Sequence, residues 1–298
     1  MHTVQSANKL YILLALAVYI ASVAVYGLRW VIVLRRAGVR LRLRDAVEAY
    51  LAGILVNNIT PSARAGGELM RIAYAYVKTG AAPAKLLNSV VFERISEAVP
   101  VVAIAVAALV EVLLSGGRAR GLIIGVALML AAIGLGVKYW DRLLEMASGR
   151  LGFSYDPGSE AALQRLLRDR RLLTVAAALG AAVWVMDIFR LYLEALAVGW
   201  RAPLGHFVTA SFLYLIIGLV AVTPGGVGIV EGGLAATFIA LGAEPKQALA
   251  ITIIERLISY VIASVLGLVV TLISGAGRAW TLLKSRWRRT GFTPRLGA

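Results

Sequence analysis

Five apolar stretches of this sequence are long enough to cross the hydrocarbon core of a membrane, which takes about 20 helical residues. These stretches are residues 10–34, 85–114, 122–139, 172–199 and 247–273. Hydrophobic residues make up 60% of the 298 positions, well above the share found in soluble domains. The sequence therefore predicts an all-α, polytopic integral membrane protein.

One stretch of the sequence occurs twice. A proline lies seven positions before a glutamate in both copies, as Pro61 and Glu68 and as Pro224 and Glu231. A second proline then lies ten positions before a Glu-Arg pair in both copies, namely Glu93-Arg94 and Glu255-Arg256. Two similar stretches at a fixed offset in a sequence indicate that a structural unit is repeated. The spacing predicts that about half of the chain is duplicated.

Each copy contains two apolar stretches that are too short to cross a membrane. At about 1.5 Å per residue, residues 46–59 reach roughly two thirds of the way, and residues 68–77 follow after a turn. Irregular backbone is tolerated at membrane depth only inside protein or beside a water-filled cavity. We expect residues 45–78, and their equivalents at 206–222 and 231–241, to form re-entrant helical hairpins. In an alternative topology each short pair crosses as two thin helices.

The first repeat with its connecting helix makes three full crossings, at 10–34, 85–114 and 122–139. Because this number is odd, the two copies are predicted to be inverted relative to each other. Basic residues gather on the cytoplasmic side of a cell membrane. The basic residues after positions 34 and 273 therefore predict an outside N-terminus and a cytoplasmic C-terminus in the plasma membrane. Inverted repeats with interrupted helices are typical of secondary transporters, which bind substrate near the membrane midplane.

The duplication divides the chain into four predicted parts. They are a first repeat with a connecting transmembrane helix (1–139), a cytoplasmic linker (140–171), a second, inverted repeat (172–276) and a basic cytoplasmic tail (277–298). Within the linker, Ser159 is placed to cap a helix whose Leu163, Leu166 and Leu167 share one face, opposite several arginines. This amphipathic helix is expected to lie on an anionic membrane surface.

Charged residues inside the apolar stretches indicate where function resides. Each costs about 2.5–3.5 kcal/mol at the bilayer centre, so such residues face a protein interior or a wet cavity. Asp187, Arg190 and Glu194 share one helical face, which lets the arginine pair with either carboxylate. The candidate substrate-binding residues are Asn57, Asn58, Arg64, Glu68, Arg71, Glu93, Arg94, Asp187, Arg190, Glu194, Glu231, Glu255 and Arg256.

Structural roles compete with transport roles at these positions. Asp187, Arg190 and Glu194 fit a structural ion network as well as a transport site. The Glu-Arg pairs are expected to lock a crossing helix to a hairpin. A functional role is favoured for Arg64 and Arg71, because the second copy has Val227 and Leu234 at the equivalent positions. A purely structural requirement would appear in both copies. Guanidinium groups are also the preferred partners of phosphate, which predicts that these two arginines bind an anionic lipid head group.

Several function classes find no support in the residues. The chain has no Cys and only two His, so thiolate sites and clustered metal ligands are not expected. No Walker motif is present, and no residue set demands catalysis. A net charge of +15 would suggest nucleic acid in a soluble protein, but in a membrane protein basic residues orient helices against anionic lipid. We expect no cofactor, no metal, no nucleic acid and no enzyme activity.

Together these motifs resemble the transmembrane domain of the lysylphosphatidylglycerol synthase family, also called the flippase-like membrane domain. The resemblance rests on residues 57–71, on Glu93-Arg94 and on residues 224–231 with Glu255-Arg256. It implies a stand-alone membrane domain, without the synthase domain, that moves modified or glycosylated lipids between leaflets. The predicted function is therefore a lipid flippase or scramblase, with a separate glycosyltransferase or aminoacyl transferase as a possible partner. A membrane-embedded transferase and a non-transporting partner of an enzyme remain alternatives.

Overall fold

The computed structural model describes residues 7–60, 65–114, 139 and 157–274, and within these ranges every regular element is a helix. Four helical segments are long and apolar enough to cross a membrane, namely α2 (Lys9–Arg36), α5 (Pro83–Leu114), α9 (Arg170–Ala197) and Pro245–Ile273. The predicted all-α, polytopic class is confirmed. The predicted crossing at 122–139, apart from Tyr139, lies outside the described residues, as does the predicted tail 277–298.

The last long segment is helical throughout but changes its winding in the middle. It consists of α12 (Pro245–Arg256), a π-helix η2 (Leu257–Ile262) and α13 (Ala263–Ile273). The π-helix begins directly after the second Glu-Arg pair. Single π turns inside α-helices are rare and occur frequently at functional sites.

Shorter helices occupy the stretches predicted to form hairpins. They are α3 (Leu43–Ile59) and α4 (Ala65–Thr79) in the first half, and α10 (Leu204–Val220), the 3-10 turn η1 (Pro224–Gly226) and α11 (Ile229–Ala240) in the second. Helix α3 ends two residues before Pro61 and α10 ends four residues before Pro224, and the residue directly before a proline disfavours helical backbone. The observed ends differ from the predicted ends by a few residues.

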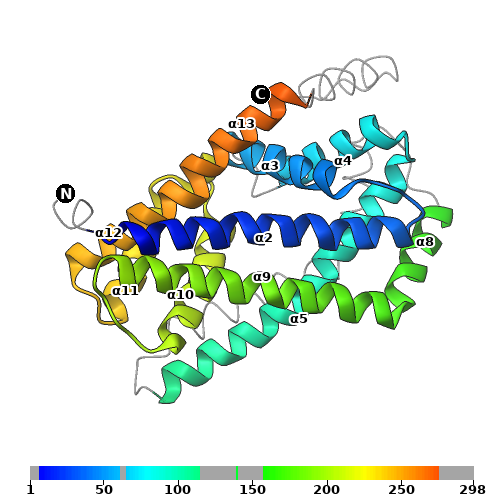
Figure 1. The fold of residues 1–298 in the computed structure, drawn as a ribbon. Helices are drawn as coiled ribbons and strands as arrows, with labels where there is room; N and C mark the ends of the chain where they lie inside the picture. The colour runs from blue at the N-terminus through cyan, green and yellow to red at the C-terminus, as the bar shows by residue number, and fades with distance from the viewer. Residues whose placement is uncertain (1–6, 61–64, 115–138, 140–156, 275–298) are drawn as a thin grey trace, which may run out of the picture.

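Helices α2 and α9 lie side by side and antiparallel through the middle of the molecule (Figure 1). At one end the backbone N–H of Asn8 donates to the carbonyl oxygen of Ala197 at 2.8 Å. At the opposite end Arg36 Nη1 lies 3.5 Å from Asp169 Oδ2. The other helices pack around this pair.

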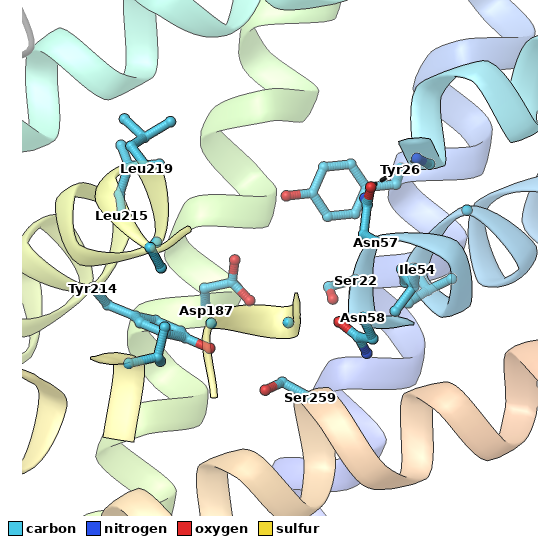
Figure 2. A pocket seen from close by; sticks show the side chains of 18 of the residues that line it. Ser22, Tyr26, Ile54, Asn57, Asn58, Asp187, Tyr214, Leu215, Leu219 and Ser259 are labelled. Carbon is cyan, nitrogen blue, oxygen red and sulfur yellow. Dashed lines mark hydrogen bonds between the residues drawn. The ribbon is translucent and has the colours of Figure 1, made fainter. Parts of the chain in front are cut away.

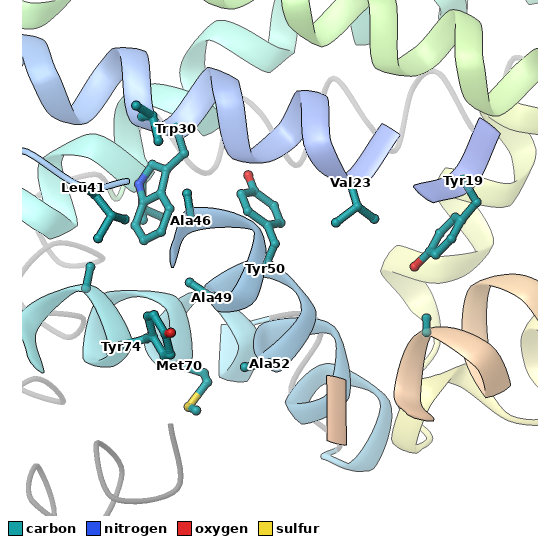
Figure 3. Packing of buried hydrophobic residues seen from close by; sticks show 14 of the residues in the cluster. Tyr19, Val23, Trp30, Leu41, Ala46, Ala49, Tyr50, Ala52, Met70 and Tyr74 are labelled. Carbon is teal, nitrogen blue, oxygen red and sulfur yellow. The ribbon is translucent and has the colours of Figure 1, made fainter. Parts of the chain in front are cut away.

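In the first half, α3 and α4 form an antiparallel hairpin. Lys78 and Asp45 pair at its open end, with Nζ and Oδ1 3.2 Å apart. At its tip the Gly67 N–H donates to Asn57 Oδ1 at 2.7 Å. Figure 3 shows Trp30 of α2 packed among residues of this hairpin, including Tyr50 of α3 and Tyr74 of α4.

In the second half, α10 and α11 form a corresponding antiparallel hairpin. Trp200 contacts Phe207 at the start of α10 and Phe238 near the end of α11, with ring centroids 5.5 and 5.7 Å apart. The tips of the two hairpins meet, because a Cβ at Gly225 would lie 2.9 Å from the carbonyl oxygen of Asn58. Asn58 also donates to Ser264 Oγ at 2.9 Å, which ties the first tip to α13.

The amphipathic helix α8 (Pro157–Arg168) differs from its prediction in two ways. It begins at Pro157, so Ser159 lies inside its first turn rather than at the N-cap, and the Ser159 carbonyl accepts from Asn88 Nδ2 at 2.8 Å. Leu163 and Leu166 are buried in a cluster with Phe92 of α5, and Leu167 packs against it. The apolar face of α8 therefore packs on the protein rather than on a membrane surface.

The close packing at the first hairpin tip generates a stability prediction. A Cβ at Gly67 would overlap the Asn57 side chain and the Gly53 carbonyl oxygen, whereas a Cβ at Gly232 meets no atom within 4 Å. Gly67→Ala should therefore destabilise the protein by about 1–3 kcal/mol, the usual cost of overpacking. Gly232→Ala, the control, should be neutral or stabilising by about 0.5–1 kcal/mol. Thermal unfolding of the two purified variants in detergent checks this, and equal midpoints would contradict the close approach.

Candidate functional site

A cavity of about 730 Å³ lies between the two halves of the chain. Its walls come from α2, α3, α4 and α5 in the first half, and from α9, α10, η1, α11, α12 and η2 in the second. Figure 2 shows Tyr26 and Asn57 on one side of this space and Asp187 and Tyr214 on the other. The cavity therefore brings together residues that are distant in the sequence.

The first-half charges form a network beside this cavity. Arg29 of α2 is fully buried, and its Nε donates to Glu93 Oε1 at 3.2 Å. Arg71 of α4 donates to Glu93 Oε2 at 2.6 Å and to Glu68 Oε2 at 2.7 Å. Glu93 thus joins the central helix α2 to the hairpin through α5.

Aromatic rings enclose the Arg71 guanidinium. Its central carbon lies 4.3 Å from the Trp30 ring centroid and 3.7 Å from that of Tyr50, and the residue is 2% exposed. Stacking on aromatic faces adds about 2 kcal/mol or more when the cation is desolvated. The charge of Arg71 is consequently compensated by two carboxylates and two rings.

Arg94 is the most accessible of the three arginines in the first-half network, Arg29, Arg71 and Arg94. It donates to Glu97 Oε2 at 2.8 Å and lies 2.9 Å from Glu68 Oε1, yet 46% of its side chain is exposed. It lines the cavity. A cation in this position keeps donor capacity for a group inside the cavity, because guanidinium carries five N–H donors.

The second-half charges centre on Arg190 of α9. Its Nη1 is hydrogen-bonded to Glu255 Oε2 of α12 and donates to Glu194 Oε1 at 3.0 Å. Its Nη2 lies 3.7 Å from Asp187 Oδ1. One arginine therefore serves three carboxylates.

Arg256 holds the second hairpin. It donates to Glu231 Oε1 at 2.6 Å and to the Gly225 carbonyl oxygen at 2.9 Å, and it lies over the Tyr260 ring. Glu231 in turn accepts from the Gly228 N–H at 2.6 Å at the start of α11. The predicted lock between a crossing helix and a hairpin is made here by the arginine of the pair.

The Glu-Arg pairs use the same pattern in both halves. The glutamate faces the arginine of a central helix, as Glu93 with Arg29 and Glu255 with Arg190. The arginine faces the glutamate at the start of the second hairpin helix, as Arg94 with Glu68 and Arg256 with Glu231. Arg71 has no counterpart, since Leu234 is the equivalent residue. The sequence analysis did not identify Glu255 as a partner of the central helix.

The predicted site residues fall into three groups. Those that line the cavity are Asn57, Asn58, Glu68, Arg71, Arg94, Asp187, Arg190, Glu255 and Arg256. Those in contact with this lining from behind are Glu93, Glu194 and Glu231. Arg64 lies outside the described residues. Whether these residues bind substrate stays a prediction.

Sequence reasoning missed several polar residues of the cavity wall. They are Tyr19, Ser22, Tyr26, Tyr50, Thr60, Ser211, Tyr214, Thr223 and Ser259. Tyrosines in an apolar stretch give the same hydrophobic pattern as core residues, so periodicity alone cannot select them. Among the residues that the structure describes, no group of three or more His, Asp or Glu side chains is arranged to hold a metal ion.

These features define a class, a multi-pass helical membrane protein whose charged residues line a cavity between its two halves. Comparison identifies the family. Residues 1–267 match the family described as "Lysylphosphatidylglycerol synthase TM region", and the chain belongs to that family. The resemblance found in the motifs is confirmed.

Three archaeal relatives carry the name UPF0104 membrane protein. The relative from Pyrococcus horikoshii is 27% identical over 288 residues, which cover 88% of this chain and 86% of the relative. One from Methanothermobacter thermautotrophicus is 25% identical over 288 residues, covering 88% and 85%. One from Methanocaldococcus jannaschii is 24% identical over 291 residues, covering 90% and 86%. The likeness extends over most of each protein.

The buried network predicts a ranking of arginine substitutions by stability. Arg190→Ala leaves three carboxylates without their shared cation, and breaking a buried ion pair costs about 3–5 kcal/mol. Arg29→Ala should cost less, because Arg71 still pairs with Glu93. Arg36→Ala removes a half-exposed pair worth about 0–1 kcal/mol and is the control.

Unfolding midpoints of the three purified variants in detergent test the ranking. The expected order of destabilisation is Arg190→Ala, then Arg29→Ala, then Arg36→Ala. A loss at Arg190 no larger than that at Arg36 would show that the network does not hold the helices together.

Proposed function

We propose that this protein moves a membrane lipid between leaflets, with the polar head group in the cavity and the apolar tails in the surrounding bilayer. The observation that carries the proposal is a cavity of about 730 Å³, lined by charged residues from both halves of a membrane protein. Cavities of about 300–1,000 Å³ are typical of small-ligand sites.

The outer surface supports a lipid substrate. The long helices expose large apolar side chains, among them Val106 and Leu114 of α5, Val185 of α9 and Leu272 of α13. Extensive exposed apolar surface marks contact with a membrane or a partner. A substrate with a polar head and apolar tails matches a polar cavity inside an apolar exterior.

The packing of the helices supports the proposal that the two halves are inverted repeats. Taking α2, α3, α4 and α5 as equivalents of α9, α10, α11 and α12–α13, the same pairs pack in both halves. The contact of α3 with α13 corresponds to that of α10 with α5, and the contact of α2 with α3 to that of α9 with α10. Inverted repeats with a substrate site between them are a common construction in transporters.

The hairpins support a re-entrant arrangement. In Figure 1 the α3–α4 hairpin begins and ends toward one end of the helical bundle, and the α10–α11 hairpin toward the other. Their tips meet at Asn58 and Gly225, beside the cavity. The proposal places these tips near the membrane midplane.

The distribution of basic residues supports the proposed orientation. The end of the bundle where α2 ends and α9 begins carries Arg35, Arg36, Arg40, Arg42, Arg44, Lys78, Lys85, Arg165, Arg168, Arg170 and Arg171. The opposite end of the described chain carries Lys9, Arg201 and Lys246. The positive-inside rule then assigns the first end to the cytoplasm and the N-terminus to the outside.

We further propose that the head group is anionic, as in a phospholipid that a separate glycosyltransferase or aminoacyl transferase has modified. Arg94 is the first candidate to bind it, because its half-exposed side chain lines the cavity. Arg71, singled out from the sequence, is already paired with Glu68 and Glu93. Its proposed part is to fix the two glutamates that position the hairpin and Arg94.

Lipid exchange in liposomes tests this function. Purified protein is reconstituted with a fluorescent anionic lipid, and the rate of exchange between leaflets is measured. Arg94→Ala should slow exchange by roughly 10- to 100-fold, since a charge-assisted hydrogen bond is worth about 1.5–3 kcal/mol. Arg94→Lys should be intermediate, because it keeps the charge and loses the bidentate fork.

Arg165→Ala, on the exposed face of α8, is the matched control and should exchange lipid at the wild-type rate. If well-folded Arg94→Ala protein also exchanges lipid at that rate, Arg94 does not bind the head group. If wild-type protein exchanges no lipid above protein-free liposomes, the transport proposal itself is wrong.

Thiol labelling tests the orientation. The chain has no Cys, so a single introduced cysteine is labelled without background. Gly158→Cys at the start of α8 and Lys246→Cys at the start of α12 lie at exposed positions on opposite ends of the bundle. In intact cells an impermeant thiol reagent should label position 246 and spare position 158. The reverse pattern would overturn the orientation, and equal labelling of both positions would overturn the topology.

A further inference from the structure

The two halves of the charged network carry different charge. In the first half, three arginines (Arg29, Arg71 and Arg94) are connected to three glutamates (Glu68, Glu93 and Glu97). In the second half, two arginines (Arg190 and Arg256) are connected to four carboxylates (Asp187, Glu194, Glu231 and Glu255). The first network is neutral when all groups are ionised, whereas the second has an excess of two negative charges.

Of these carboxylates, that of Glu194 has the least compensation for its negative charge. It is fully buried, and its Oε1 accepts from Arg190 at 3.0 Å. Its Oε2 is also buried and has no hydrogen-bond partner among the described residues. A buried carboxylate oxygen without a donor is costly when ionised, because a charge removed from water needs compensation.

The neighbouring groups offer no further cation to Glu194. The titratable and charged groups around this cluster are Asp187 and Arg190 on α9, Glu255 and Arg256 on α12, Tyr19 and Tyr26 on α2, and Tyr214 on α10. Glu97 on α5 lies beyond Tyr26, and the cations nearest to it, Arg29 and Arg94, are already paired with first-half glutamates. Arg190 is shared with Glu255, which is itself fully buried. Arg256 is held by Glu231 and Gly225 at the second hairpin.

We propose that Glu194 binds one exchangeable proton on Oε2 and that this cluster is a proton-binding site facing the lipid cavity. The proton comes from water and adds to the carboxylate, which becomes a neutral carboxyl group and lowers the excess negative charge by one. A metal ion is the less suitable counter-charge, because within the described chain no cluster of His, Asp or Glu is arranged to hold one. A proton needs only the one free oxygen.

Glu194 is connected to the cavity by the charged residues around it. Arg190, Glu255 and Asp187 line the cavity, and 29% of the Asp187 side chain is exposed. Resting on the proposed function, the inference adds that proton binding favours entry of an anionic head group, because it removes a like charge directly behind Arg190 in the cavity wall. Transport of an anionic lipid should then be faster at mildly acidic than at mildly alkaline pH.

Infrared spectroscopy of the purified full-length protein tests the proton site without reference to transport. Wild-type protein at neutral pH should show the C=O stretch of a protonated carboxyl group, and Glu194→Gln should lack that component. Glu160→Gln, an exposed glutamate of α8, is the matched control and should retain it. Absence of the band from wild-type protein overturns the proposal, and this result does not depend on whether a variant folds. Loss of the band in Asp187→Asn but not in Glu194→Gln overturns the assignment to Glu194.

Lipid exchange measured across pH then tests the coupling. Wild-type exchange of the anionic lipid should fall by up to about tenfold per pH unit once Glu194 releases its proton, as for control by one titrating group. Glu194→Gln, which mimics the protonated state, should lose this dependence, and Glu160→Gln should keep it. A pH-dependent Glu194→Gln protein overturns the coupling. A protonated carboxyl band without any lipid exchange supports the proton site and contradicts the proposed function, whereas exchange without the band does the opposite.

Discussion

A charged side chain inside a membrane protein needs a compensating charge, and this constraint organises the described helices. In each Glu-Arg pair, the glutamate forms an ion pair with an arginine of a central helix, α2 or α9. The arginine forms an ion pair with a glutamate of a hairpin. Adjacent residues on a helix point to different faces, so one pair joins three elements. Removing one partner leaves another charge buried and unpaired, at a cost of about 3–5 kcal/mol. The charges therefore position the hairpins around the cavity.

The two halves satisfy this constraint in different ways. The first half adds Arg71, which stacks between Trp30 and Tyr50 and neutralises its network. The second half has Leu234 in its place and adds carboxylates on α9 instead. A cavity between such halves has one wall with balanced charge and one wall with excess negative charge. The two halves thus have similar helix packing but different charged residues.

The helices and the charged candidates were predictable from sequence, because apolar length and buried charge are both local signals. The Glu-Arg pairs were expected to lock a crossing helix to a hairpin, because adjacent residues on a helix point to different faces. Arg29 was not recognised as a buried partner, because it lies near a basic flank that the membrane surface explains equally well. Likewise, amphipathicity in α8 predicted a buried face but not the surface that buries it. Partner identity depends on tertiary packing, which a single sequence does not encode locally.

The π-helix Leu257–Ile262 changes the direction in which the side chains of the last crossing helix point. A π turn accommodates one residue more than an α turn, and one residue corresponds to about 100° of rotation around the helix axis. Before it, Glu255 and Arg256 reach α9 and the second hairpin; after it, Ser264 reaches Asn58 at the tip of the first hairpin. A rod of uniform pitch would place one of these sets out of register. The extra residue lets a single helix contact both hairpins, since α12 packs on α11 and α13 packs on α3.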